Sequence, residues 1–337
     1  MVKIAVIGAG ENLGREMLDV FSEHDIPSKD IYALEPKSPM GTLVSYGEDD
    51  ELDVFNLDDF DFSKVDVALV TSTSEVAKRY IPKIEAKGIQ IIDCSGASAD
   101  NPDVPMIVAD LNDHILKENT KNIVSVPSAL VTQVLKPLAK VASKFGLKRI
   151  VLTAYLSTSF HSREAMDELF DQTRRIYMNA PIADHQDIFQ KQIAFNVLPQ
   201  VGSFIGDETE NEWRINAEIK KIINADIKVH ANLAYVPAFI GAGVFANIET
   251  ERAFDLDDVR DLIKSVKGVT IFDKQVDGGY VSLNDIQGQN DIFVSRLRQD
   301  LSTDNGFSFW ATADNLRADM AQNAFDILTA VLKNRSK

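Results

Sequence analysis

Continuous apolar runs alternate with helical periodicities along the first third of the chain. Between the runs, apolar residues recur at helical spacing, as Leu13, Met17 and Val20 do after the first run. Because the runs are continuously apolar, they are typical of parallel strands that are buried on both faces. The pattern predicts an α/β domain with a Rossmann-like, doubly wound parallel sheet, whose strands lie in residues 2–7, 31–34, 66–70, 89–92 and 122–126.

The pattern of apolar residues changes after Pro127. Alternating stretches at residues 228–236 and 268–272 favour a mixed or antiparallel sheet. A further strand is predicted at residues 149–156, and helices at residues 130–144, 162–179 and 315–332. We therefore predict two domains: residues 1–127 together with a returning C-terminal helix in 315–337, and an α+β domain over residues 128–314.

The composition limits the classes of function. A net charge of −16 over 337 residues argues against a nucleic-acid partner, because phosphate backbones attract basic surfaces. No apolar run approaches the ~20 residues that cross a bilayer, and the N-terminus lacks the features of a secretory signal. We therefore expect a cytoplasmic protein with no membrane association. The acidic stretches at residues 47–61 and 207–212 are interpreted as solvated loops and helix ends.

A glycine-rich turn follows the first predicted strand and leads into a helix. In this context, glycine backbone and a helix N-terminus receive the pyrophosphate of a dinucleotide. Glu35 ends the second strand, at the position where an acidic residue hydrogen-bonds the adenosine ribose of NAD. An acid there repels the extra phosphate of NADP, although the positive charge of Lys37 nearby weakens that repulsion. NAD or NADP is therefore a candidate cofactor. The candidate cofactor-binding residues are Gly8, Gly10, Glu11, Asn12, Leu13, Gly14 and Glu35.

The same turn is also compatible with a purely structural role. Its spacing is one residue longer than the commonest dinucleotide fingerprint. Glu11 favours this alternative, because a carboxylate at the mouth of a phosphate site opposes an anionic ligand. On this alternative the dinucleotide is bound weakly or not at all.

Five motifs are spread over nearly the whole chain. They are DCSGA with PDVP at residues 93–105, REAMDEL at 163–169, FNVLPQ at 195–200, RLRQDL at 296–301 and ADNLR at 313–317. In this order they resemble the motifs of the aspartate-semialdehyde dehydrogenase family. The resemblance implies a dinucleotide-binding domain followed by a domain that forms a homodimer. It also implies a reference reaction, the NADPH-dependent reductive dephosphorylation of aspartyl phosphate through a cysteine thioester.

The residues that the resemblance would make catalytic are replaced in this chain. Ala129 stands where the family has its nucleophilic cysteine, Ala242 where it has its histidine base, and Tyr235 where it has a substrate-clamping arginine. A methyl group cannot form a thioester. The resemblance therefore predicts no catalytic residue for the usual chemistry. Further replaced positions are Ala99 for a phosphate-binding arginine, Leu156 for a glutamine, Asn211 for an acid and Arg214 for a lysine.

Other residues are poor substitutes for the missing groups. Cys94 is the only cysteine and stands at the family's asparagine position without a basic neighbour in the sequence, so we interpret it as structural. Ser128 would need a base to ionise, and the base position is Ala242. We interpret His161 as a surface histidine at a helix start. The spacing of the other histidines does not indicate a metal site, and a single cysteine excludes most cysteine-based ones.

Three hypotheses for the function follow. The first is a dimeric homologue that is inactive in the usual thioester chemistry, similar to the Usg-type relatives that also lack the cysteine. It would act through a partner protein, with a dinucleotide or a small acidic metabolite as candidate ligand. The second is an NAD(P)-dependent oxidoreductase that transfers hydride without the usual cysteine. The third is the family's usual activity, which the replaced residues oppose.

Overall fold

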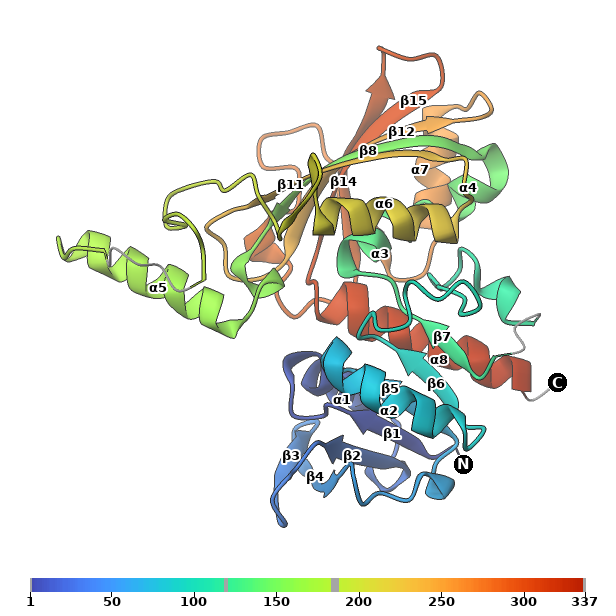
Figure 1. Ribbon diagram of the computed structural model, residues 1–337. Helices are drawn as coiled ribbons and strands as arrows, with labels where there is room; N and C mark the ends of the chain where they lie inside the picture. The colour runs from blue at the N-terminus through green and yellow to red at the C-terminus, as the bar shows by residue number, and fades with distance from the viewer. Residues whose placement is uncertain (1, 118–120, 183–187, 336–337) are drawn as a thin grey trace. The chain divides into compact units, whose positions relative to one another are not determined.

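The computed structural model describes residues 2–117, 121–182 and 188–335. The chain folds as two compact units. Unit 1 comprises Met1–Thr132 and Leu316–Lys337, and unit 2 comprises Gln133–Asn315. Each unit contains one large sheet (Figure 1). Among the described residues, no helix has the length and apolar character needed to span a bilayer.

Unit 1 is built on a seven-stranded sheet with the order β3-β4-β2-β1-β5-β6-β7. All neighbours pair in parallel except β3, which pairs antiparallel with β4 at one edge. β2 lies on one side of β1 and β5 on the other, so the strand order reverses at β1. Ligands of such sheets bind outside the carboxyl ends of the strands at this reversal. This confirms the predicted doubly wound sheet. Its strands are β1 (Ile4–Ile7), β2 (Ile31–Glu35), β3 (Leu43–Tyr46), β4 (Asp50–Asn56), β5 (Val67–Val70), β6 (Gln90–Asp93) and β7 (Ile123–Ser125).

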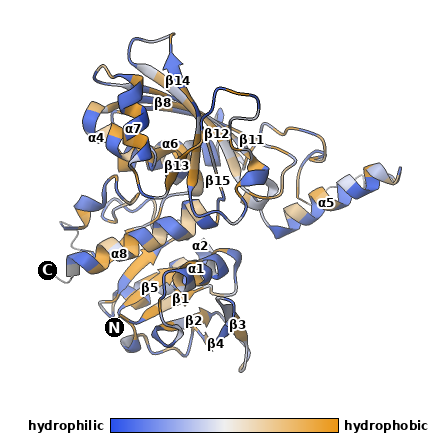
Figure 2. Ribbon diagram, turned by 180° about the vertical axis from the view of Figure 1, so that it is seen from behind, coloured by the Kyte–Doolittle hydropathy of each residue, from blue (hydrophilic) through white to orange (hydrophobic). Residues whose placement is uncertain are grey.

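Two separate hydrophobic cores lie on the two faces of this sheet. Ile4 and Val6 of β1 join a core with α1 and α8, whereas Ala5 and Ile7 join a core with α2. Because both faces are covered, the central strands are hydrophobic throughout (Figure 2). The helices of unit 1 are α1 (Asn12–Glu23), α2 (Ser74–Glu85), α8 (Asn323–Arg335), the π-helical η6 (Arg317–Gln322), and the 3₁₀ helices η1 (Ser28–Asp30), η2 (Phe62–Lys64) and η3 (Asp113–Lys117).

The β3–β4 hairpin corrects the interpretation of the acidic stretch at residues 47–61 as loops and helix ends. β4 runs through this stretch, with Leu52 and Val54 buried while Glu51 and Asp53 are exposed. The acidic side chains therefore form the solvent face of an amphipathic strand. The second acidic stretch, at residues 207–212, does lie at the start of helix α6 (Glu210–Ile222).

Two predicted helices are interrupted in the structure. The helix predicted over residues 130–144 is divided into α3 (Ala129–Leu135) and α4 (Ala139–Phe145). Pro137 lies between them, and proline breaks a helix because it lacks an N–H donor and its ring clashes with the preceding turn. The helix predicted over residues 315–332 begins as the π-helical turn η6, in which the Ala321 N–H donates to the Leu316 carbonyl. Apolar spacing alone does not reveal such a turn.

Unit 2 is built on a six-stranded mixed sheet with the order β11-β8-β12-β15-β14-β13. β11 pairs in parallel with β8 and β13 with β14, and the remaining pairs are antiparallel. This confirms the mixed sheet expected for the second domain. Its strands are β8 (Leu147–Leu156), β11 (Lys228–Tyr235), β12 (Ala242–Thr250), β13 (Val269–Ile271), β14 (Ile292–Asp300) and β15 (Gly306–Ala313), with a small hairpin of β9 (Phe204–Ile205) and β10 (Glu208–Thr209).

The two faces of the unit 2 sheet differ in burial. On one face, Leu152, Ala246 and Phe309 are fully buried. On the other face, Thr153, Phe245 and Trp310 lie side by side in the strand register and are half-buried. Helix α5 extends away from the sheet of its own unit (Figure 1). Besides α4 and α6, the helices of this unit are α5 (Arg163–Tyr177), α7 (Leu256–Lys264) and the 3₁₀ helices η4 (Thr158–Phe160) and η5 (Leu283–Asp285), while the division between the units falls within α3.

Candidate functional site

The glycine turn of unit 1 connects β1 directly to α1. Gly8 has a φ of +91°, and a Cβ there would lie 2.8 Å from the backbone of Ser72. A Cβ at Gly14 would lie 1.9 Å from the Gly8 carbonyl oxygen. The first turn of α1 therefore packs against the turn so closely that both positions require glycine. The Gly8 N–H donates to the Leu34 carbonyl at 2.9 Å, which fixes the turn beside the end of β2.

Glu35 lies at the end of β2 and points its carboxylate at the glycine turn. Its Oε1 accepts a hydrogen bond of 2.6 Å from the Gly10 N–H. Burial raises the pKa of Glu35, the hydrogen bond from Gly10 opposes this rise, and the nearby Glu11 carboxylate adds to it. The acid predicted to bind a ribose is thus bonded to the turn, close to a second acid.

Glu11 is held by Ser72, a residue that the sequence analysis did not select. The Ser72 Oγ donates to Glu11 Oε1 at 2.8 Å. Glu11 occupies the N-cap position of α1 with extended backbone, and its side chain makes no capping hydrogen bond. Ser72 follows β5, which pairs with β1, so the neighbouring strand end brings it to the turn. Its position after an apolar strand was the available sequence signal.

The two remaining predicted residues of the turn differ in their surroundings. Asn12, the first residue of α1, is exposed. Leu13 is partly buried and packs against the core beside α1. The structure therefore brings Gly8, Gly10, Glu11 and Glu35 together around the turn, whereas the side chain of Leu13 faces the core.

Cys94 is a buried thiol directly after β6. Burial raises its pKa, and the adjacent Asp93 carboxylate adds to the rise. Asp93 is itself fully buried and accepts hydrogen bonds from the Ser95 N–H at 2.9 Å and the Ser98 N–H at 2.8 Å. Burial and the neighbouring carboxylate thus disfavour the thiolate of Cys94, which is the reactive form of cysteine.

Ala129 is the first residue of α3 and is half-buried. The carbonyl of the preceding Ser128 accepts hydrogen bonds from the Val131 and Thr132 N–H groups at 3.0 and 3.1 Å. The side chain at the position of the family's nucleophile is therefore a methyl group at the start of a helix.

Ala242 begins β12 in unit 2 and is fully buried. It pairs with Leu156 of β8 and Ala313 of β15, and its carbonyl accepts a hydrogen bond of 2.9 Å from Gln133 Nε2. The position of the family's histidine base is thus closed by strand pairing and apolar neighbours.

Tyr235 lies in an aromatic cluster with His161 and Phe189. The ring centroid of Tyr235 is 5.1 Å from that of Phe189 and 6.3 Å from that of His161. Burial raises the pKa of Tyr235 to about 12, so its phenol is neutral at physiological pH. Where the resemblance implies a cationic clamp for a carboxylate, the chain presents an uncharged aromatic side chain. His161 itself is exposed just before α5.

Arg214 keeps a positive charge in α6 but uses it within the helix. Its Nε donates at 2.8 Å to Glu218, which is buried and lies one turn later. Asn211 donates from its side-chain amide to the Val201 carbonyl at 3.2 Å. Both side chains therefore have structural partners within unit 2.

A cavity of about 570 Å³ opens on the half-buried face of the unit 2 sheet. Its volume falls in the range of small-molecule pockets. Sequence reasoning missed it, because its lining comes from separate strands and a loop. The lining residues are Ala238, Phe245, Tyr280, Ser282, Leu283, Asn284, Arg296 and Trp310.

Metal binding has no visible basis in the described ranges. No group of three or more histidine, cysteine, aspartate or glutamate side chains that could hold an ion occurs among them.

Comparison with known proteins identifies the family. The model of the semialdehyde dehydrogenase NAD binding domain matches residues 3–119, and that of the semialdehyde dehydrogenase dimerisation domain matches residues 135–318. The aspartate-semialdehyde dehydrogenase of Rickettsia bellii is 36% identical over 332 residues, which cover 98% of this chain and 97% of that relative. The chain belongs to the aspartate-semialdehyde dehydrogenase family.

Further relatives agree with this assignment over the full length. The aspartate-semialdehyde dehydrogenase of Legionella pneumophila is 32% identical, covering 97% of this chain and 94% of that relative. The crystal structure of aspartate semialdehyde dehydrogenase II of Vibrio cholerae, complexed with ASA, superposes with a TM-score of 0.91 at 27% identity, covering 99% of this chain and 98% of the other. The resemblance seen in the five motifs is thereby confirmed at the level of the family.

Proposed function

We propose that this aspartate-semialdehyde dehydrogenase homologue does not carry out the usual thioester chemistry and acts as a non-catalytic, dimeric protein of Usg type. The observation that carries the proposal is the methyl side chain of Ala129 at the nucleophile position. A thioester requires a sulfur nucleophile, and proton transfer requires a base. Ala242 and Tyr235 support the proposal independently, since neither supplies a base or a cation at neutral pH.

No neighbouring residue compensates for Ala129 in this proposal. Cys94 is buried with a raised pKa. The hydroxyl of Ser128 would need a base to become nucleophilic, and the base position holds Ala242. Substitution at several functional positions within a preserved fold is the pattern expected after a loss of catalysis.

An activity assay tests this proposal directly. We expect that wild-type protein gives no phosphate-dependent reduction of NAD or NADP with aspartate semialdehyde above the rate of a protein-free blank. The Ala129→Cys variant should also remain inactive, because the base is still absent. The Ala129→Cys/Ala242→His variant supplies both the thiol and the base, and it tests whether the dehydrogenase activity is partly restored. Wild-type turnover above that of Ala129→Cys would contradict the proposal.

Dinucleotide binding is proposed to be weak. The strand–turn–helix of the NAD binding domain is present, with Gly8 and Gly14 in their required places. Glu11 and Glu35 put two carboxylates at this turn. Calorimetric titration of NAD and NADP should therefore give dissociation constants in the millimolar range. Micromolar binding of either cofactor would favour the alternative hypothesis, an oxidoreductase that transfers hydride without the cysteine.

A homodimer is proposed through the half-buried face of the unit 2 sheet. The dimerisation-domain model covers this sheet. Tyr155, Phe245 and Trp310 form a continuous aromatic surface there, with ring centroids of Phe245 and Trp310 4.7 Å apart. Half-exposed aromatic side chains in a pocketed surface are typical of the centre of protein interfaces.

Light scattering coupled to size-exclusion chromatography tests the dimer. Wild-type protein should have twice the chain mass, and Phe245→Lys should shift it towards the monomer, because a desolvated charge would be placed in the interface. Met40→Lys is the matched control, since Met40 is fully exposed in unit 1. A wild-type monomer, or a Phe245→Lys dimer as stable as that of the control, would contradict the proposed interface.

A further inference from the structure

One face of the β3–β4 hairpin in unit 1 is covered and the other is open. The inward side chains of both strands are buried in the core beside α1. Leu43 and Phe55 point to the opposite face, where 52% of Leu43 and 43% of Phe55 remain exposed. Together with Met40, they are the large apolar side chains that are exposed in the described part of unit 1. Exposed apolar residues gathered in one segment mark a surface with a function, unlike residues exposed singly.

Phe55 belongs to a cluster of aromatic rings on this open face. Its ring centroid lies 6.1 Å from those of Tyr32 and Phe60, which are themselves 5.3 Å apart. Phe60 packs edge-on against the buried Phe62, with centroids 5.2 Å apart. The cluster therefore holds the Phe55 ring in place, so a partner does not have to order this side chain on binding. Aromatic side chains are enriched at protein interfaces.

Acidic side chains lie beside the ring cluster. Glu51 and Asp53 point to the same face of β4 as Phe55, since side chains alternate along a strand. Both are exposed, and neither carboxylate has a hydrogen-bond or ion-pair partner among the described residues. Residues 47–61 contain eight acidic residues and no lysine or arginine. We call the resulting surface the hairpin face; its residues are Tyr32, Leu43, Glu51, Asp53, Phe55 and Phe60.

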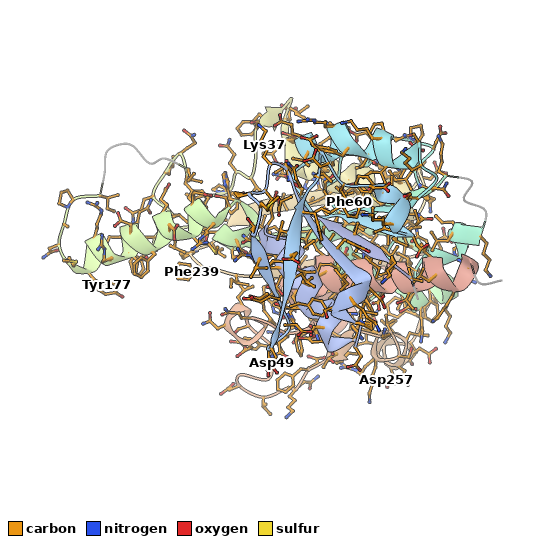
Figure 3. The ribbon with its side chains drawn as sticks, turned by 90° about the horizontal axis from the view of Figure 1, so that it is seen from below. Lys37, Asp49, Phe60, Tyr177, Phe239 and Asp257 are labelled. Atoms are coloured by element: carbon orange, nitrogen blue, oxygen red, sulfur yellow. The ribbon has the colours of Figure 1, made fainter. Side chains whose placement is uncertain are left out.

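Cationic side chains of neighbouring segments do not neutralise the hairpin face. Arg79 of α2 donates to Asp58 at 3.1 Å. Lys83 of the same helix lies over the ring of Tyr80, 4.8 Å from its centroid. Lys37 is well separated from Asp49, which lies at the turn of the hairpin (Figure 3). The hairpin face thus joins exposed rings to unpaired negative charge.

This combination selects the chemistry of a partner. Acids repel nucleic acids and other anions. A second copy that used the same face across a twofold axis would bring like charges together. An arginine guanidinium stacks on aromatic rings and also binds carboxylates in a bidentate manner, whereas the ammonium of lysine is a compact, strongly hydrated charge. Arginine is therefore the side chain that matches both features of the hairpin face.

We infer that the hairpin face is a docking surface for an arginine-rich segment of another protein. Phe55 receives a guanidinium on its ring, and Glu51 and Asp53 pair with neighbouring arginines of the segment. The inference goes beyond the proposed function, because it concerns unit 1 and holds whether or not the protein is catalytically active. The activity assay and the binding test below can therefore fail separately.

The test is a calorimetric titration of the full chain with a synthetic peptide of four Arg-Gly repeats, blocked at both ends, at low salt. The corresponding Lys-Gly peptide should bind about fivefold more weakly, because its ammonium groups stack less well on the rings. Glu51→Gln/Asp53→Asn should weaken binding of the arginine peptide about tenfold, through the loss of two exposed ion pairs. Wild-type protein that does not bind the arginine peptide at millimolar concentration would overturn the inference.

Phe55→Leu separates the effect of the ring from that of the charges. Leucine keeps the side chain apolar for packing against the cluster but has no aromatic face for a cation. The variant should bind the arginine peptide about fivefold more weakly and the lysine peptide within about twofold of wild type, so the preference for arginine is lost. An unchanged preference in Phe55→Leu would overturn the role of the ring and with it the inference.

Asp207→Asn/Glu210→Gln is the matched control for the change in charge. It removes the same two charges from exposed positions of the other acidic stretch, in unit 2. This variant should bind the arginine peptide within about twofold of wild type. If it weakens binding as much as Glu51→Gln/Asp53→Asn does, the peptide responds to the net charge of the chain and the inference is overturned.

Discussion

The Trp310 indole lies directly over Gly243. A Cβ added at Gly243 would fall 2.1 Å from Cη2 and 2.4 Å from Cζ2 of the Trp310 ring. The indole Nε1 donates to the Val281 carbonyl at 2.9 Å, so the ring is also held from its other side. The aromatic surface proposed for the dimer therefore depends on the absence of a side chain at one position of β12.

Gly243→Ala should displace Trp310 and destabilise unit 2. Overpacking of this kind costs about 1–3 kcal/mol, which corresponds to a fall in Tm of a few degrees for a domain of this size. Thermal unfolding followed by near-ultraviolet circular dichroism measures the change. In a Trp310→Leu background the same substitution should cost much less, since the clash is gone. Additive costs in the two backgrounds would contradict the contact.

Gly14→Ala should destabilise unit 1 even though alanine is the better helix former. Helix propensity alone favours alanine by about 1 kcal/mol. The added Cβ would meet the Gly8 carbonyl oxygen at 1.9 Å, and this neighbour is backbone that cannot rotate away. We expect a net loss of about 3 kcal/mol in unfolding free energy, at the upper end of overpacking costs, measured by urea denaturation. A stabilised variant would show that α1 does not pack against the turn as described.

Cys94 should react slowly with thiol reagents in the folded protein. Its thiol is buried and its pKa is raised, so both access and thiolate fraction are reduced. With Ellman's reagent at pH 8, we expect native Cys94 to react about 100-fold more slowly than after unfolding in guanidinium chloride. The Ala129→Cys variant should add a second, faster phase, because Ala129 is only half-buried. A single fast phase in the wild-type protein would reopen Cys94 as a nucleophile.

The strands of unit 1 were predictable because both faces of its sheet are covered. The runs at β1, β5 and β6 are apolar at every central position, and this pattern needs no tertiary information. β4 was missed because its outward positions carry acids, which made the segment resemble a solvated loop. In unit 2 the long strands were found only in part, since β12 and β15 mix small, aromatic and polar residues although most of their positions are buried.

The candidate site was predictable where it follows from chain order. Gly8 follows β1 and Glu35 ends β2, so their meeting at one sheet edge follows from the parallel pairing of these two strands. Ser72 was not found, because its contact with Glu11 depends on which strand lies on the other side of β1. The same holds for the contact of Gly243 with the Trp310 ring, which joins two strands far apart in sequence. Tertiary neighbours of this kind leave no periodic signal.

Glu35→Gln should change the pH dependence of stability in a defined direction. The pKa of Glu35 is raised in the folded protein, so the folded state holds its proton more firmly than the unfolded state. Wild-type stability should therefore fall as the pH rises from the unfolded value, about 4.3, through the raised folded value, and stay lower above it. Glu35→Gln removes this fall and keeps an oxygen that accepts from Gly10, so the stability advantage of the variant over wild type should grow across that pH range.

Asp61→Asn is a control of opposite sign. Hydrogen bonds from Ser63 lower the pKa of Asp61 in the folded protein. The wild-type carboxylate therefore stabilises the folded state above its unfolded pKa, and this stabilisation is lost as the pH falls. Urea denaturation at several pH values between about 2 and 8 covers the titration of both carboxyl groups. Parallel pH profiles for wild type and Glu35→Gln would contradict a buried, proton-retaining Glu35.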